Sequence, residues 1–328
     1  MTSTLVRQHV PHPSSPGAAA PRARARDWAE IQERMLVPLY EAVYERLEVG
    51  AGTRLLGLGC GSGLALLMAA ARGAAVCGVD PDEERLELAR ERLLARPGPR
   101  SGAWPGAGER GARLVRLGDG GLGDALKGTE AEAAGTGSGS GTGTGTGSGS
   151  GSGFTVVTAF EPLSAIGPGG GPCGPGDALS GRLAAAAALA EPGSPVVLAG
   201  WGPPERCATS TVLRVGARLA DPMFPQLPLG GAPSPARWQP SGRDDLEHLA
   251  QRAGLRPDGS GRVACPFGYA DMDSAVRGLL STGLFDAAER ATDPAQVRKE
   301  IAEALHPYRR QDGTVWMENV MRYLIARV

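Results

Sequence analysis

Three closely spaced glycines and one acid are the residues of this sequence with the clearest chemistry. The stretch RLLGLGCGSGLALLMAAARGAAVCGVD, residues 54–80, places Gly59, Gly61 and Gly63 between an apolar run and a helical pattern, and it ends at Asp80. A strand that enters a helix through glycines presents main-chain amides to a ligand, and glycine lets the backbone approach that ligand closely. The pattern predicts a nucleotide-binding turn with an acid on the neighbouring strand.

The glycine spacing separates two classes of nucleotide site. A dinucleotide site of the nicotinamide type requires G-x-G-x-x-G. Counted from each possible first glycine, the last position of that pattern is not glycine but Ser62, Leu64 or Leu66. An NAD(P)-dependent oxidoreductase is therefore a disfavoured alternative.

The observed spacing, G-x-G-x-G, resembles motif I of the class I S-adenosylmethionine-dependent methyltransferases. That motif is an acid followed by x-G-C-G-x-G, and LLGLGCGSGLA matches it except at the acid, where Gly57 stands. Further stretches that resemble the family are GVDPDEERLELARERL, LGDG, FTVVTAFEPLSAIG, EPGSPVVLAGWGPPERC and the segment from CPFGYADMDSAVRGLLSTG to the end. The resemblance covers most of residues 27–328 and is closest to actinobacterial small-molecule members.

The resemblance implies the roles of individual residues. Gly59, Gly61 and Gly63 would form the cofactor loop, Asp80 would hold the ribose hydroxyls and Asp119 would lie near the adenine amino group. The implied cofactor is S-adenosyl-L-methionine, and the implied reaction is in-line transfer of its methyl group to a small-molecule acceptor. For Asp80, the residues also allow a role as the cap of the helix that follows Pro81, either alone or together with the ribose contact.

Three features depart from the family pattern. Gly57 replaces the acid of motif I, Thr155 stands where an acid commonly follows the aromatic residue, and GTGSGSGTGTGTGSGSGSG, residues 135–153, precedes the fourth strand. We expect this tether to enter beside the cofactor pocket. These departures keep open an alternative, a catalytically inactive methyltransferase-like protein that serves as a binding or scaffold module.

A general base is needed only where the acceptor must lose a proton. Glu161, after the fourth strand, and His306, near the end of a helix, are the weak candidates. His248 is expected on a helix surface, and Trp201 either lines the pocket or packs in the core.

Composition excludes several other classes of function. The net charge is −1, and no basic surface with interleaved aromatic residues is indicated, so no nucleic-acid partner is expected. The five cysteines form no CxxC pair, so no metal site is expected. No apolar run is long enough to span a bilayer, and no signal peptide is recognisable, which predicts a cytoplasmic protein without a membrane partner. The oligomeric state is left open.

Alternating strand and helix patterns must position these residues, and they predict an α/β fold. The expected class is the Rossmann-like methyltransferase three-layer sandwich, with a mostly parallel sheet and an antiparallel last strand. Residues 1–26 are expected to be a disordered tail and residues 27–328 the methyltransferase domain. A loop at 97–111 and a flexible Gly/Ser/Thr-rich insertion at 120–153 interrupt that domain, and residues 203–240 and 266–310 are expected to cover the substrate as a lid.

Overall fold

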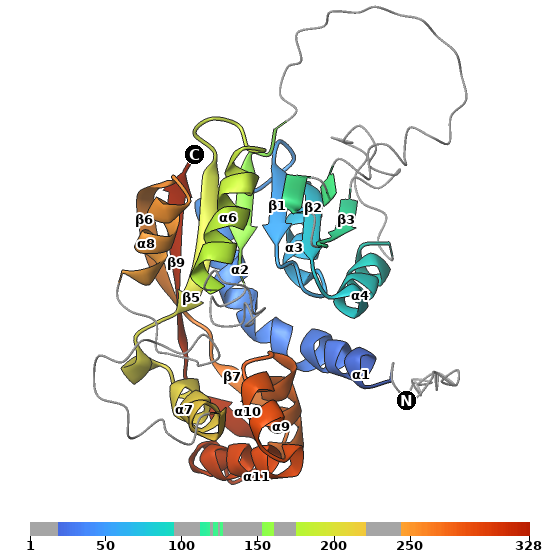
Figure 1. Cartoon of the computed structure of the whole chain (residues 1–328), viewed down its shortest axis with the longest axis vertical. Coiled ribbons are helices and arrows are strands. Elements are labelled where there is room, and N and C mark those ends of the chain that lie inside the picture. The colour runs from blue at the N-terminus through green and yellow to red at the C-terminus, as the bar shows by residue number, and fades with distance from the viewer. Residues whose placement is uncertain are drawn as a thin grey trace, which may run out of the picture.

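A seven-stranded sheet is the centre of the computed structural model, which describes residues 19–94, 112–118, 121–123, 125–126, 153–160, 175–220 and 244–328 (Figure 1). Its strands lie in the order β3-β2-β1-β4-β5-β9-β6. Strand β9 is antiparallel to β5 and β6, and the other neighbouring pairs are parallel. The expected sheet is confirmed. The strands are β1 Arg54–Leu58, β2 Ala75–Asp80, β3 Ala112–Arg116, β4 Val156–Ala159, β5 Pro195–Trp201, β6 Arg256–Ala264 and β9 Val320–Arg327.

Both faces of the central strands are buried, as a parallel sheet requires. Neighbouring residues belong to opposite faces: Leu55 packs in one hydrophobic core and Leu56 in the other. The first core lies under α2 (Val37–Arg46), α3 (Leu64–Ala71) and α4 (Glu83–Leu94), and the second under α6 (Pro175–Ala187) and α8 (Asp245–Arg252). The three-layer sandwich is confirmed.

A helical subdomain lies beyond the carboxyl edge of the sheet (Figure 1). It contains α7 Thr209–Ala220, α9 Met272–Ser281, α10 Asp286–Ala291 and α11 Pro294–Leu305, with the short elements η4 Pro204–Arg206, β7 Phe267–Tyr269, η6 His306–Tyr308 and β8 Val315–Met317. These elements, apart from β8, fall within the expected lid segments, although residues 221–243 lie outside the described ranges. The pattern of residues 272–306 predicts two helical stretches, whereas the structure has three helices, because Gly283 and the Asp293–Pro294 step interrupt the pattern.

The N-terminal segment is more ordered than predicted. Residues 19–26, assigned to the tail, belong to α1 (Ala19–Asp27), in which Ala25 is buried. The chain continues through a π-helical turn, η1 (Trp28–Gln32), and a 3₁₀ turn, η2 (Glu33–Leu36), into α2. Pro38 lies in the first turn of α2, where a proline needs no hydrogen-bond donor. We call residues 19–36 the N-terminal cap; it contacts both α4 and α9.

The C-terminal end differs from the sequence pattern in two places. The apolar pattern of TVWMENVMRYLIARV predicts one strand, but the segment forms β8 and β9, with Glu318 and Asn319 between them. Strand β6 was not predicted, because Pro257, Gly259 and Gly261 have poor strand propensity. Pairing with β9 overrides that propensity, and the Tyr323 ring lies over Gly261 directly opposite it.

The ends of the Gly/Ser/Thr-rich insertion are described, although residues 127–152 are not. The insertion was expected to begin at residue 120, yet Leu122 and Leu126 are buried in the second core. Gly153 lies at the amino end of β4, where its carbonyl accepts a hydrogen bond from Arg54 Nε (2.6 Å). The amino ends of parallel strands lie opposite the glycine turn, so the expectation that the tether enters beside the cofactor pocket was wrong. The expected 97–111 loop lies outside the described residues.

Asn319 joins the helical subdomain to the sheet. Its buried side chain accepts a hydrogen bond from Thr209 N–H at the start of α7 (3.1 Å) and donates one to the Met317 carbonyl (3.4 Å). We expect Asn319→Ala to lower the free energy of unfolding by about 1–3 kcal/mol, because it leaves a buried amide without a partner. Urea unfolding measures this change. The exposed neighbour Glu318→Ala is the control, and equal stability of the two variants would contradict the assignment.

Candidate functional site

The glycine loop adopts a backbone that only glycine tolerates well. Gly59, Gly61 and Gly63 have φ angles of +62°, +55° and +79°, in the region that side chains disfavour. Cys60 N–H donates to the Val79 carbonyl of β2 (3.1 Å), and Gly63 N–H donates to the Cys60 carbonyl (3.0 Å). The loop is thereby tied to the neighbouring strand, and Gly63 leads directly into α3.

Asp80 faces this loop from the end of β2 and is 2% exposed. Its Oδ2 accepts a hydrogen bond from Gly61 N–H (2.8 Å), and its Oδ1 accepts one from Asp82 N–H (2.8 Å). Burial raises the pKa of Asp80, an effect that the Arg85 guanidinium and the two amide hydrogen bonds oppose. A carboxylate offers about four acceptor positions, so these two amides leave acceptor capacity for other donors.

Asp82, rather than Asp80, caps the helix that follows β2. Its Oδ1 accepts hydrogen bonds from Glu84 N–H (3.0 Å) and Arg85 N–H (3.2 Å). The helix-cap role that the sequence allowed for Asp80 is thus filled by Asp82, and the carboxylate of Asp80 is directed to the loop.

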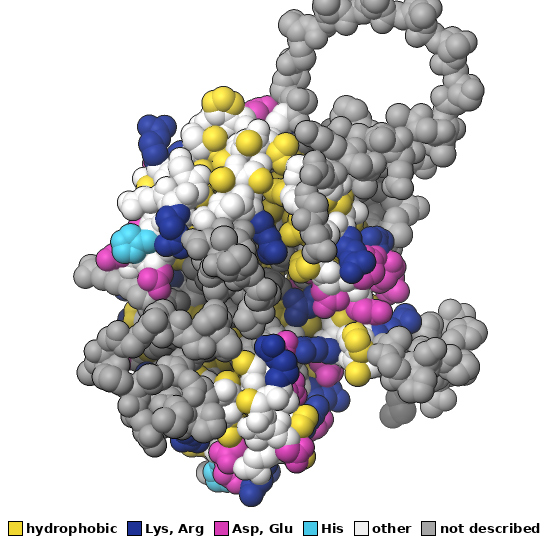
Figure 2. Space-filling model, in the orientation of Figure 1, with side chains coloured by type: hydrophobic (Ala, Val, Ile, Leu, Met, Phe, Trp, Pro, Cys, Tyr) yellow, Lys and Arg dark blue, Asp and Glu magenta, His cyan; other side chains and the backbone are white. Residues whose placement is uncertain are grey.

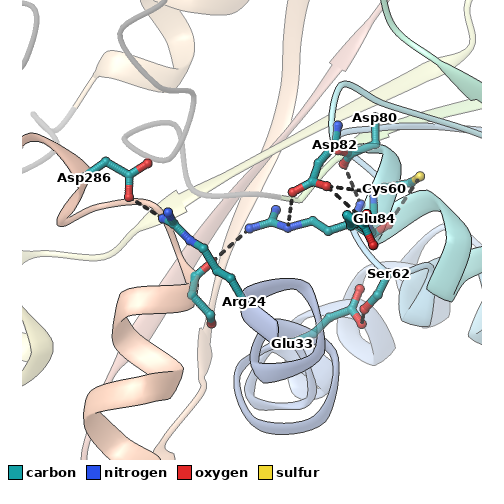
Figure 3. A network of polar contacts seen from close by, with 11 residues as sticks. Arg24, Glu33, Cys60, Ser62, Asp80, Asp82, Glu84 and Asp286 are labelled. Carbon is teal, nitrogen blue, oxygen red and sulfur yellow. Dashed lines mark hydrogen bonds and ion pairs between the residues drawn. The ribbon is translucent and has the colours of Figure 1, made fainter. Parts of the chain in front are cut away.

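The N-terminal cap covers the glycine loop (Figure 3). The Trp28 indole lies against Gly61: a Cβ atom built on Gly61 would lie 2.9 Å from Trp28 Nε1 and 3.2 Å from Glu33 Oε1. Glu33, also buried, points to Ser62 and accepts a hydrogen bond from its hydroxyl. Neither cap residue was predicted as part of the site, because each fits the apolar or polar pattern of an ordinary amphipathic helix.

The cap leaves little space at the loop. The cavity there, lined by described residues of the cap, β1, the loop, α3 and β4, has a volume of about 20 Å³, close to the room that one water needs. Pockets for cofactor-sized ligands have roughly 300–1,000 Å³. The backbone and Asp80 thus fit a nucleoside, whereas the space in this conformation does not.

Aromatic residues border the same cavity at the end of β4. Phe160, the residue after β4, packs against Tyr40 of α2 with ring centroids 4.9 Å apart, and both line the cavity. Trp28 is also in contact with the Arg85 guanidinium, 4.5 Å from the ring centroid. Its indole N–H, buried, has no hydrogen-bond partner within the described ranges.

The other predicted site residues are not brought to the loop. Asp119 and Glu161 lie outside the described residues. His306 is exposed at the start of η6 and His248 on α8, whereas Trp201 is buried at the end of β5. Thr155 accepts a hydrogen bond from Arg54 N–H (2.8 Å) at the amino ends of β1 and β4, so its departure from the family pattern lies away from the loop.

Metal and membrane features were searched in the described part of the chain. No group of three His, Cys, Asp or Glu side chains there could hold a metal ion. None of the helices there has both the length and the apolar character needed to cross a membrane.

Comparison with known proteins finds matches to the segment that contains the glycine loop. Residues 56–98 match the family described as "Methyltransferase domain". Methyltransferase GfsG of Streptomyces halstedii is 44% identical over 66 residues, which are 20% of this chain and 22% of that protein. The match thus spans about a fifth of the relative's length.

Solved structures with similar folds include two bacterial proteins. A putative methyltransferase from Bacillus halodurans has 12% identity and a TM-score of 0.47, over 88% of this chain and 97% of that one. An S-adenosylmethionine-dependent methyltransferase from Geobacter sulfurreducens has 17% identity and a TM-score of 0.43, over 90% and 92%. The segment matched by the family, residues 56–98, contains the glycine loop and Asp80, so this part of the chain is similar to a methyltransferase domain.

The loop backbone gives a direct test. Gly61→Ala forces a side chain into a left-handed conformation and against the Trp28 indole, and we expect it to lower the free energy of unfolding by about 1–3 kcal/mol. Gly52→Ala is the control, because a Cβ there meets no atom within 4 Å. Thermal and urea unfolding measure both variants. Equal stability of Gly61→Ala and the parent would show that the loop does not hold this conformation.

Proposed function

We propose that the protein transfers a methyl group from S-adenosyl-L-methionine to a small-molecule acceptor. The observation that carries the proposal is the juxtaposition of three left-handed glycines and the Asp80 carboxylate at the carboxyl edge of a parallel sheet. Ligands of open α/β sheets bind at this edge. The relatives named above are methyltransferases, which supports the same reaction.

In this proposal the chain binds and aligns, and the bound cofactor supplies an electrophilic methyl group. Asp80, held by Gly61 and Asp82, directs its remaining acceptor positions to the ribose hydroxyls, and the loop lets its amides lie close to the amino-acid end. Alignment of two reactants can lower a barrier by roughly 7–11 kcal/mol. Phe160 and Tyr40, which line the cavity, would exclude water from the reacting end. None of these roles needs a general base.

The structure is a closed form of such a site. Because about 20 Å³ remains at the loop, we propose that Trp28 leaves Gly61 when the cofactor binds. The buried indole N–H without a described partner costs free energy in the closed form. The Arg85 contact and the packing of the cap on α9 offset that cost.

A larger cleft supports a small-molecule acceptor. It has a volume of about 1030 Å³ and lies between η4, α7 and the start of β9. Because β9 is antiparallel to β5, the start of β9 and the end of β5 lie at the same sheet edge as the glycine loop. The cleft contains both signs of charge, from Glu205, Arg206, Arg214 and Glu318. Acidic and basic side chains are also interspersed on the face drawn in Figure 2.

Asp80→Asn tests the ribose contact. The variant keeps the size of the side chain but loses its charge, so we expect the affinity for S-adenosylhomocysteine to fall roughly 10- to 100-fold, the value of about 1.5–3 kcal/mol for a hydrogen bond to a charged group. Burial raises the pKa of Asp80. The affinity of the parent should therefore fall as the pH falls through that raised pKa, earlier than for an ordinary aspartate, and Asp80→Asn should lack this dependence.

Titration calorimetry at several pH values measures both effects. Asp258→Asn, an exposed acid paired with Arg327, is the control. Absence of binding by the parent at millimolar S-adenosylhomocysteine would contradict the proposed activity and favour a non-catalytic binding or scaffold protein.

Trp28→Ala tests the closed form. Without the indole over Gly61 the competent state is populated more often, so the association rate of S-adenosylhomocysteine should rise several-fold. Stopped-flow measurements report this rate. Trp316→Ala, at an exposed tryptophan, is the control, and an unchanged rate in Trp28→Ala would show that Trp28 does not limit access.

A further inference from the structure

The place of the missing motif acid is filled by an apolar side chain. Gly57 pairs with Gly78 of β2, and α3 packs tightly over both residues through Leu66. A Cβ atom on Gly57 would lie 3.0 Å from Leu66 Cδ2, and one on Gly78 would lie 2.4 Å from Leu66 Cδ1. An acid at position 57 would contact this leucine, and Leu66 would have to shift by a few tenths of an ångström to admit it.

A carboxylate reaches the loop from a different element. Glu33, on the 3₁₀ turn of the N-terminal cap, lines the same small cavity as Gly57 and is 2% exposed. Its carboxylate accepts hydrogen bonds from the Ser62 hydroxyl and from Leu64 N–H (3.3 Å). Leu64 is the first residue of α3, and the residue before it, Gly63, has no side chain to cap the helix. Glu33 is thus a cap supplied from a distant part of the chain.

Arg92 completes the arrangement from α4. Its guanidinium forms an ion pair with Glu33 and donates to the Ser62 carbonyl (3.0 Å), the Ser62 hydroxyl (3.0 Å) and the Ala29 carbonyl (2.7 Å). The same arginine therefore contacts the acid, the loop and the cap. Arg92 and Glu33 both hold Ser62, and Glu33 also holds Leu64; these are the two residues on either side of Gly63.

Global stability does not explain why this acid is buried. Burial raises the pKa of Glu33, while Arg92, Ser62 and Leu64 oppose that rise. The desolvation of a buried ion pair commonly cancels its attraction, so such a pair is weak evidence for a stabilising role. A carboxylate at a helix N-terminus does, however, fix the orientation of the terminal amides.

We propose that Glu33 is the positioning residue of the glycine loop, in place of the acid that β1 lacks at position 57. The proposal rests on the proposed cofactor function. Glu33 contacts Ser62 and Leu64, and through them it sets the backbone from Gly59 to Gly63 that receives the cofactor. The N-terminal cap is consequently part of the cofactor site and not only a cover for it.

Glu33→Gln in the full chain tests the proposal with two readouts. The first is hydrogen–deuterium exchange of the loop amides without ligand, which should become faster. The second is calorimetry with S-adenosylhomocysteine, whose affinity should fall by about tenfold or more, because a hydrogen bond to a charged group is lost. Glu247→Gln is the matched control: Glu247 is a partly buried acid paired with Arg322 on α8 and β9, away from the loop.

The two readouts separate the possible failures. The proposal is overturned if Glu33→Gln and Glu247→Gln show the same exchange rates of the loop amides and the same affinity for S-adenosylhomocysteine. It is also overturned if the loop amides of Glu33→Gln exchange faster while its affinity stays within twofold of the parent. If the parent itself does not bind S-adenosylhomocysteine, the proposed function fails, whereas the exchange measurement still decides whether Glu33 orders the loop. If Glu33→Gln does not fold, Ser62→Ala removes one of the same contacts and should raise loop exchange to a smaller extent.

Discussion

The hydrogen bond from Gly61 N–H to the Asp80 carboxylate is the contact on which the site depends. It joins the loop after β1 to the end of β2, and it forms only because Gly61 adopts a left-handed backbone that turns its amide toward the acid. The parallel pairing of β1 with β2 brings the two strand ends to the same edge. From this contact follow the direction of α3, the burial of Asp80 and the position of any nucleoside held there.

The N-terminal cap adds side chains to the site that the glycine loop itself does not supply. The cap contributes a tryptophan that lies on the loop and an acid that holds it. An ion pair joins Arg24 of the cap to Asp286 of the helical subdomain (Figure 3), and a second joins Asp27 of the cap to Arg277. The cap thus contacts both the glycine loop and the helical subdomain, so a movement of the cap would change contacts with both parts.

The fold was predictable from the sequence where local signals agree with tertiary structure. Apolar strands such as VVTAF and the alternation of strands with helices predicted the sheet, and the glycine spacing with Asp80 predicted the loop. Strand β6 was missed because its glycines and proline are tolerated only through pairing with β9. The order of residues 19–26 was missed because arginine-rich α1 is held by contacts with α4 and α9, which sequence periodicity does not reveal.

The cap residues of the site could not be predicted for a related reason. The sequence showed the loss of the acid at position 57 but not its replacement, because Glu33 reaches the loop through the fold and not through the motif. Conversely, Thr155 was read as a weakness of the site, yet it lies at the opposite edge of the sheet, where it joins β1 to β4. For both Glu33 and Thr155, contacts between segments far apart in the sequence determine where the side chain lies.

A crystal structure of the full chain with S-adenosylhomocysteine tests the central claim most directly. The account predicts ribose hydroxyls within hydrogen-bond distance of Asp80, the amino-acid end beside Gly59 and Gly61, and a Trp28 side chain displaced from its present place. Ligand bound elsewhere while Trp28 still covers Gly61 would contradict it.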